Sequence, residues 1–202
     1  MMSKILWKNM FKNIILKYYI LINIISFKLN KRVTFGSNLR IRGPFYLNMD
    51  DRAILQVGNN FSMSSGLMLN PLGRNLKSIF KIDSNAKITI GNNVGMSNIS
   101  IWSKESISIG NDVKMGAGVI IMDSDMHSLD YSLRRNYTTD EKNAISKSIV
   151  IHDDVFIGVN SIITKGISIG EKSIIAAGSV VVKSIPSNEI WGGNPAVFIK
   201  KI

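Results

Sequence analysis

The two histidines of the chain are its best candidates for proton transfer near neutral pH. They are His127 and His152, and the chain contains no cysteine, which rules out thiolate nucleophiles and disulfides. His127 lies in the polar run MDSDMHSLD, close in sequence to Asp123, Asp125 and Asp130. A neighbouring carboxylate can orient an imidazole or raise its basicity. We therefore predict that His127 is a general base, with Asp125 as a candidate to orient it or to contact an acceptor.

His152 has a different setting. It follows Ile151 directly inside a regular aliphatic pattern, so we interpret it as structural. A zinc site of the carbonic anhydrase kind uses three histidine ligands, and the chain has two histidines in all. We therefore expect no metal. No G-x-S-x-G segment is present, so nothing indicates a covalent acyl-serine intermediate.

The segments around these residues repeat every six positions. Aliphatic or large apolar residues recur at this step at Ile151, Ile157, Ile163, Ile169, Ile175 and Val181; at Ile109, Met115 and Ile121; at Ile90, Met96 and Trp102; at Val57, Met63 and Leu69; and, less regularly, at Phe35, Ile41 and Leu47. A period of six fits neither an α-helix nor a simple alternating strand. It predicts short strands that each point one side chain to the axis of a prism, with coils stacked about 4.8 Å apart. The fold class we expect is all-β, a parallel β-helix.

Three segments depart from the repeat. The repeat itself occupies residues 33–185. Before it, residues 1–32 are apolar and basic and predict a helical segment. After it, residues 186–202 form a tail that begins at Pro186. Within the repeat, residues 123–148 are polar and break the frame. A long loop inside a compact domain is typically functional, and this one holds His127.

The net charge of +11 is concentrated in the N-terminal segment. Nine lysines and arginines precede Asp50, the first acidic residue, and the chain beyond is close to neutral. A nucleic-acid groove is usually built into the folded body, so we expect no nucleic-acid partner. Residues 1–30 predict either a helix that caps the first coil or a basic amphipathic helix on an anionic membrane surface. We expect a cytoplasmic protein, with the inner face of the membrane as the second possible location.

The repeat, the histidine loop and the closing run GVNSIITKGISIGEKSIIAAGSVVVKSIPSNEIWGGNPAVFIKKI together resemble the hexapeptide-repeat acyltransferases. The resemblance is greatest to the galactoside and maltose acetyltransferase group and its polysaccharide O-acetyltransferase relatives. It implies a left-handed coil, a homotrimer with sites between subunits, and acetyl transfer from acetyl-CoA to a sugar or glycan hydroxyl.

The resemblance also implies roles for single residues. His127, with Leu133 and Arg134 downstream, matches the catalytic histidine, and Asn98 matches an asparagine that contacts the acceptor sugar. The CoA-binding positions that the resemblance implies are Phe156, Val159, Ala177, Val182, Lys183 and Lys200. At Phe156, Val159 and Val182 the chain departs from the usual tryptophan, serine and threonine, which puts those side-chain contacts in doubt but not backbone contacts.

Other functions of the same fold stay open on the sequence. They are an N-acetyltransferase for a nucleotide-linked amino sugar, a serine or antibiotic acetyltransferase, and an inactive scaffold. The residues that bind the acceptor would distinguish the first two from a sugar O-acetyltransferase. A catalytically active His127 would distinguish a sugar O-acetyltransferase from an inactive scaffold.

Overall fold

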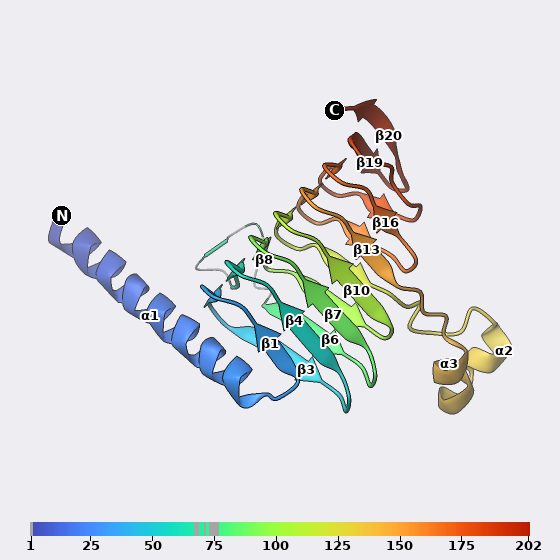
Figure 1. The fold of residues 1–202 in the computed structure, drawn as a ribbon, viewed down its shortest axis with the longest axis horizontal. Coiled ribbons are helices and arrows are strands. Elements are labelled where there is room, and N and C mark those ends of the chain that lie inside the picture. The colour runs from blue at the N-terminus through green and yellow to red at the C-terminus, as the bar shows by residue number, and fades with distance from the viewer. Residues whose placement is uncertain (1, 67–68, 71, 73–76) are drawn as a thin grey trace.

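The strands of the chain wind into a left-handed parallel β-helix (Figure 1). The structure, a computed structural model, describes residues 2–66, 69–70, 72 and 77–202. Each strand is followed by a turn onto the next face of a three-sided prism, so each face gathers every third strand of the repeat into a parallel sheet. The fold class predicted from the six-residue period is thereby confirmed.

The strands of the first sheet are, in order, β1 (Val33–Phe35), β4 (Ile54–Val57), β7 (Lys87–Ile90), β10 (Ser106–Ile109), β13 (Ile149–Ile151) and β16 (Ser168–Ile169). The second sheet holds β2 (Arg40–Arg42), β5 (Ser62–Ser64), β8 (Gly95–Ser97), β11 (Lys114–Met115), β14 (Phe156–Ile157), β17 (Ile174–Ile175), β19 (Glu189–Gly193) and β20 (Ala196–Lys201). The third sheet holds β3 (Phe45–Met49), β6 (Ser78–Ile82), β9 (Ser100–Ser103), β12 (Ile120–Met122), β15 (Ile162–Ile163) and β18 (Val180–Val181).

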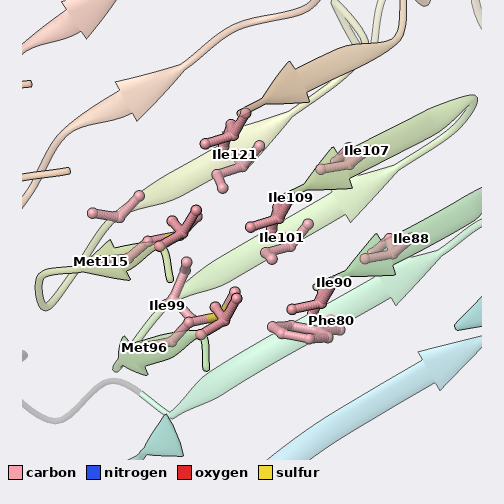
Figure 2. Close-up of a cluster of buried hydrophobic side chains, with 14 of the residues drawn as sticks. Phe80, Ile88, Ile90, Met96, Ile99, Ile101, Ile107, Ile109, Met115 and Ile121 are labelled. Atoms are coloured by element: carbon pink, nitrogen blue, oxygen red, sulfur yellow. The ribbon is translucent and has the colours of Figure 1, made fainter. Parts of the chain in front are cut away.

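The axis of the prism is filled by stacked aliphatic side chains, as Figure 2 shows for the middle coils. Ile90, Ile109 and Ile151 pair in register in the first sheet, and Met115 pairs with Ile157 in the second. No coil closes its own core, because each axial residue is buried by the residues above and below it.

The register of two coils differs from the strict six-residue step. In β9 the axial residue is Ile101, with 1% of its surface exposed, while Trp102 is 41% exposed and points outward. In the preceding coil the third face is β6, where Phe80 pairs with Ile101, so Leu69 lies in the connecting segment instead of on the axis. The prediction that Trp102 and Leu69 are axial was wrong, because turns of unequal length shift the frame. The first coil is as expected: Phe35 pairs with Val57, Ile41 with Met63 and Leu47 with Phe80.

A ladder of amide and carboxylate side chains runs along one corner, between the first and second sheets. The Asn59 backbone N–H donates to Asn92 Oδ1 at 2.8 Å, the Asn92 N–H to Asn111 Oδ1 at 2.9 Å, and the Asn111 N–H to Asp153 Oδ1 at 2.7 Å. The residue before each of these asparagines is a glycine where the next coil lies too close for a side chain. At Gly110, for example, a Cβ atom would lie 2.8 Å from the Asp153 backbone nitrogen. The GNN and GND repeats of the sequence thus satisfy the backbone of successive turns.

The ends of the prism are closed differently. Helix α1 (Met2–Leu29) packs against β1 and β2 at the N-terminal end, as Figure 1 shows. At the other end β19 pairs in parallel with β17, and β20 folds back antiparallel on β19. Residues 189–201 therefore extend the second sheet, although the sequence suggested that the tail leaves the repeat at residue 186.

Candidate active site

The loop of residues 123–148 leaves the prism between β12 and β13 and is closed at its base. The Lys147 N–H donates to the Asp123 carbonyl at 2.8 Å, and the Asp125 N–H donates to the Ile145 carbonyl at 3.0 Å. The Asp123 side chain is fully buried and accepts hydrogen bonds from Ser103 Oγ and from the backbone of the coil below. The loop is therefore anchored to the coil below and held as a closed projection.

Two short helices build the outer part of the loop. They are α2 (Tyr131–Arg134), capped by Asp130, and α3 (Tyr137–Asn143), capped by Asn136. The Arg134 guanidinium donates to the Ser128 carbonyl at 2.6 Å, which ties α2 to the segment that follows His127. The Leu-Arg pair of the resemblance thus has a structural part in shaping this loop.

His127 pairs with Asp140, a residue of α3. His127 Nδ1 lies 2.7 Å from Asp140 Oδ2, and the Ser128 N–H donates to Asp140 Oδ1 at 2.6 Å. The hydrogen bond to His127 and the one from Ser128 lower the pKa of Asp140 below its ordinary value of 3.8. Asp140 is therefore ionised at neutral pH, and a carboxylate at this position favours the tautomer of the neutral imidazole that carries its proton on Nδ1 and leaves Nε2 free to accept one.

This arrangement corrects one of the two roles considered for Asp125, the orientation of His127, whereas its contact with an acceptor stays a prediction. Asp125 forms an ion pair with Lys165 of the coil above, at 2.5 Å, and its other carboxylate oxygen is buried with no hydrogen-bond partner among the described residues. It braces the loop base, so the group that orients His127 is Asp140. His152 lies outside the loop, with Nε2 3.3 Å from Ser168 Oγ.

His127 borders a cleft of about 400 Å³ that runs down one corner of the prism. The corner joins the third sheet to the first, and its lining residues are Asp50, Lys81, Asp83, Trp102, Lys104, Met126, His127, Tyr137, Asp140 and Glu141. Charges of both signs alternate along it: Lys81 lies 2.6 Å from Asp50 and 3.3 Å from Asp83, which in turn accepts from Trp102 Nε1 at 2.9 Å. Such a wall offers donors and acceptors to several hydroxyl groups at once.

An apolar groove of about 530 Å³ continues from the cleft over the outer face of the third sheet. Its lining shares Lys81, Trp102 and Met126 with the cleft and adds Tyr46, Asn48, Ile79, Ser100, Ile101, Ile120, Ile121 and Met122. Trp102 thus lies where the polar and apolar parts meet.

Asn98 lies apart from the cleft. It is buried, its Oδ1 accepts from the Gly66 N–H at 2.7 Å, and its Nδ2 donates to the Asn70 carbonyl at 3.1 Å. Both ends of the amide are therefore occupied within the chain. Its contact with an acceptor stays a prediction.

Known proteins share both this architecture and much of the sequence. Residues 148–183 match the model of the hexapeptide repeat of succinyl-transferase. WbbJ of Escherichia coli K12, assigned as a lipopolysaccharide biosynthesis O-acetyl transferase, is 32% identical over 174 residues, which cover 84% of this chain and 82% of WbbJ. The chain belongs to the hexapeptide-repeat acyltransferases. The galactoside O-acetyltransferase of Lactococcus lactis is 27% identical over 83% of this chain and 62% of its own length.

A solved acyltransferase structure shares the fold. The S84A variant of AntD, an N-acyltransferase of Bacillus cereus, in complex with dTDP-4-amino-4,6-dideoxyglucose and coenzyme A, superposes with a TM-score of 0.66 at 20% identity, covering 86% of each chain. At that sequence identity, the similarity shows a shared fold and nothing about the acceptor.

Within one chain of this acyltransferase, the expected CoA-binding residues lie on two corners of the prism and on the second sheet. Val182 and Lys183 follow β18 on the same corner as His127 and line a hollow of about 240 Å³ with residues of the tail. Val159 and Ala177 lie on another corner, between the second and third sheets, and Phe156 is half-exposed on the second sheet. Lys200 lies exposed on β20, opposite Ile190. A single chain does not bring all six together.

The sequence reasoning missed Asp140 and Trp102. Asp140 lies 13 positions after His127, so only helix α3, which begins at Tyr137, brings it back to the ring. The Asn-Tyr-Thr-Thr-Asp run, with Asn136 as the cap, was a capping signal for that helix. Trp102 was assigned to the core by the strict step. Among the described residues, no cluster of three His, Asp or Glu side chains is placed to hold a metal ion.

Proposed function

We propose that this acyltransferase transfers the acetyl group of acetyl-CoA to a hydroxyl of a sugar, in the synthesis of a surface polysaccharide or lipopolysaccharide. The single observation that carries the proposal is the His127–Asp140 pair at the edge of a cleft lined with polar groups. The names of the two sequence relatives, a lipopolysaccharide O-acetyl transferase and a galactoside O-acetyltransferase, support a sugar as the acceptor.

The proposed mechanism uses His127 as general base. While Nδ1–H stays hydrogen-bonded to the Asp140 carboxylate, Nε2 accepts the proton of the acceptor hydroxyl as that oxygen attacks the thioester carbonyl carbon. The tetrahedral intermediate collapses by breaking the carbon–sulfur bond, and the imidazolium returns its proton to the leaving thiolate. A general base of this kind contributes about 10²- to 10⁴-fold in rate.

We also propose that the chain works as a homotrimer with each site formed between two subunits. The support is the division of the expected CoA-binding positions between two corners of the prism. In a cyclic trimer, each interface pairs one surface of a chain with a different surface of its neighbour. A groove between two prisms would therefore bring together one corner of one chain and a different corner of the next.

The test is acetyl transfer from acetyl-CoA to a panel of free, nucleotide-linked and lipid-linked sugars, measured by mass spectrometry. The wild-type protein should acetylate at least one hydroxyl acceptor, and His127→Ala should lose about 100-fold or more in kcat. Binding of acetyl-CoA, measured by calorimetry on both proteins, should be unchanged. His152→Ala is the matched control and should retain full activity.

Two results contradict the proposal. Turnover by His127→Ala within threefold of the wild type would rule out His127 as the general base. Transfer to an amino group of a nucleotide-linked sugar, with none to hydroxyls, would replace the O-acetyltransferase with an N-acetyltransferase.

A further inference from the structure

Helix α1 has two apolar faces, and only one of them is covered by the prism. On the inner face Phe27 is buried, with its ring centroid 5.8 Å from that of Phe35 and 6.0 Å from that of Phe45. Asn23 is also buried, and its Nδ2 donates to the carbonyls of Ile41 at 3.1 Å and Gly43 at 3.2 Å. The inner face therefore caps the first coil.

The outer face carries an apolar stripe that no described residue covers. Its members recur at the three- and four-residue steps of one helix face and are 45–78% exposed: Met10, Phe11, Ile14, Tyr18, Leu21, Ile25 and Leu29. Exposed lysines, Lys17 and Lys28, fall at one border of the stripe by helical geometry. A continuous exposed stripe of this size on a soluble surface marks an interaction site.

We propose that this outer stripe binds the surface of an anionic lipid bilayer. Charge identifies the partner: α1 contains five lysines and no acidic residue, and four more lysines and arginines follow it before Asp50, the first acidic residue. Cations beside an apolar helical face are typical of helices that lie in the headgroup region, where the apolar side chains enter the acyl boundary and the lysines meet lipid phosphates. A second copy of this chain would bring like charges together instead.

The helix lies on the bilayer and does not cross it. Residues 10–29 are long and apolar enough to span a membrane by length and composition alone. In a spanning helix, however, lipid surrounds every face, whereas Asn23 and Phe27 are held by the first coil. The prism therefore stands on the membrane with its N-terminal end toward the lipid.

One consequence rests on the proposed function. The cleft that ends at His127 begins at Asp50 of the first coil and passes Lys81 and Lys104 in the next two. The loop that carries His127 follows β12 of the fourth coil, so His127 stands three coils above the α1 end, with coils about 5 Å apart. The lower end of the cleft then faces the headgroups, which suits a glycan carried on a lipid.

Vesicle flotation of the full chain tests the proposal without any activity measurement. The protein should float with vesicles of equal parts phosphatidylglycerol and phosphatidylcholine and should bind pure phosphatidylcholine much less. Leu21→Ser/Ile25→Ser should weaken binding by about tenfold or more, because two side chains of the stripe no longer enter the acyl region. Ile54→Ser/Ile199→Ser is the matched control, since both residues are similarly exposed elsewhere, and it should bind like the wild type.

A second pair of variants isolates the charge. Lys17→Gln/Lys28→Gln should lose roughly 25-fold in affinity for the anionic vesicles, while Lys17→Arg/Lys28→Arg should lose nothing. Circular dichroism melting of each variant verifies that it is folded.

Three outcomes overturn the proposal. The first is equal flotation of Leu21→Ser/Ile25→Ser and wild type. The second is unchanged vesicle binding by Leu21→Ser/Ile25→Ser together with a smaller oligomer in sedimentation velocity. That result would make the stripe a contact between copies of the chain. The third is resistance of the vesicle-bound protein to alkaline carbonate extraction, which would mean that α1 spans the bilayer.

Discussion

At the scale of residues, the proposed chemistry depends on a carboxylate that favours one tautomer of one imidazole. Asp140 accepts from His127 Nδ1 and from the Ser128 N–H, so the ring and the loop backbone are held by the same group. Met126, directly before His127, has a φ of 64°, a left-handed conformation that costs a non-glycine residue roughly 1–3 kcal/mol. The closed loop base and the Asp140 contacts offset this strain and aim the histidine at the cleft.

Asp140→Asn tests the positioning role. The amide can present its NH₂ group to Nδ1, which favours the wrong tautomer, so we expect kcat to fall by about 10- to 1,000-fold while KM for acetyl-CoA stays unchanged. Asp130→Asn is the matched control, because Asp130 belongs to the same loop and caps α2 without touching the ring. Equal losses in the two variants would show that Asp140 acts on loop stability alone.

The contribution of Asp140 to loop stability should also depend on pH. Because its pKa in the folded protein is lowered below 3.8, the stabilisation is fully present above that value and is lost as the pH falls through the lower folded-state pKa. Hydrogen exchange of the 123–148 amides, measured against those of the prism, should report earlier loosening of the loop in acid. Asp140→Asn should remove the difference.

At the scale of elements, strand β9 shows how one strand serves both core and site. Alternate side chains of a strand face opposite sides, so Ile101 points to the axis and Trp102 to the cleft and groove. The residue that packs in the core and the residue that lines the cleft are therefore neighbours in sequence.

Substitution of these two neighbours should separate stability from binding. Ile101→Ala should lower the free energy of unfolding by about 2–5 kcal/mol, because it leaves a cavity between coils. Trp102→Ala should cost stability far less and should raise KM for the acceptor without changing KM for acetyl-CoA. Denaturant unfolding and steady-state kinetics measure the two effects, and the reverse pattern would contradict the register of β9.

At the scale of the whole molecule, a prism with a projecting loop is suited to sharing sites between copies. His127 projects from one corner while Val159 and Ala177 lie on another. Because coils stack in one direction, parallel association of three prisms keeps every loop at the same height and every α1 at the same end. The proposed trimer and the proposed membrane contact are thus geometrically compatible.

Mixed trimers test the shared site. When His127→Ala and Ala177→Glu chains are co-expressed with different tags, about one interface in four should combine an intact His127 with an intact Ala177 if the chains mix at random. Each doubly tagged trimer contains one such interface among its three, because the homotrimers are removed by the tag selection. These trimers should therefore show about a third of wild-type activity, while each variant alone shows almost none. Inactive mixed trimers would place each complete site within one chain.

The sequence by itself determined the prism, because a six-residue aliphatic step has few other ways to bury its side chains. It also indicated His127 as the candidate base, since one histidine in a polar break of the repeat is a local signal. The tertiary structure decided what depends on segments far apart in sequence: that Asp140 and not Asp125 orients His127, and that the turns of unequal length carry Trp102 outward. It also decided that α1 caps the first coil with one apolar face and exposes the other, because a helical sequence specifies its faces but not the surface that covers each one.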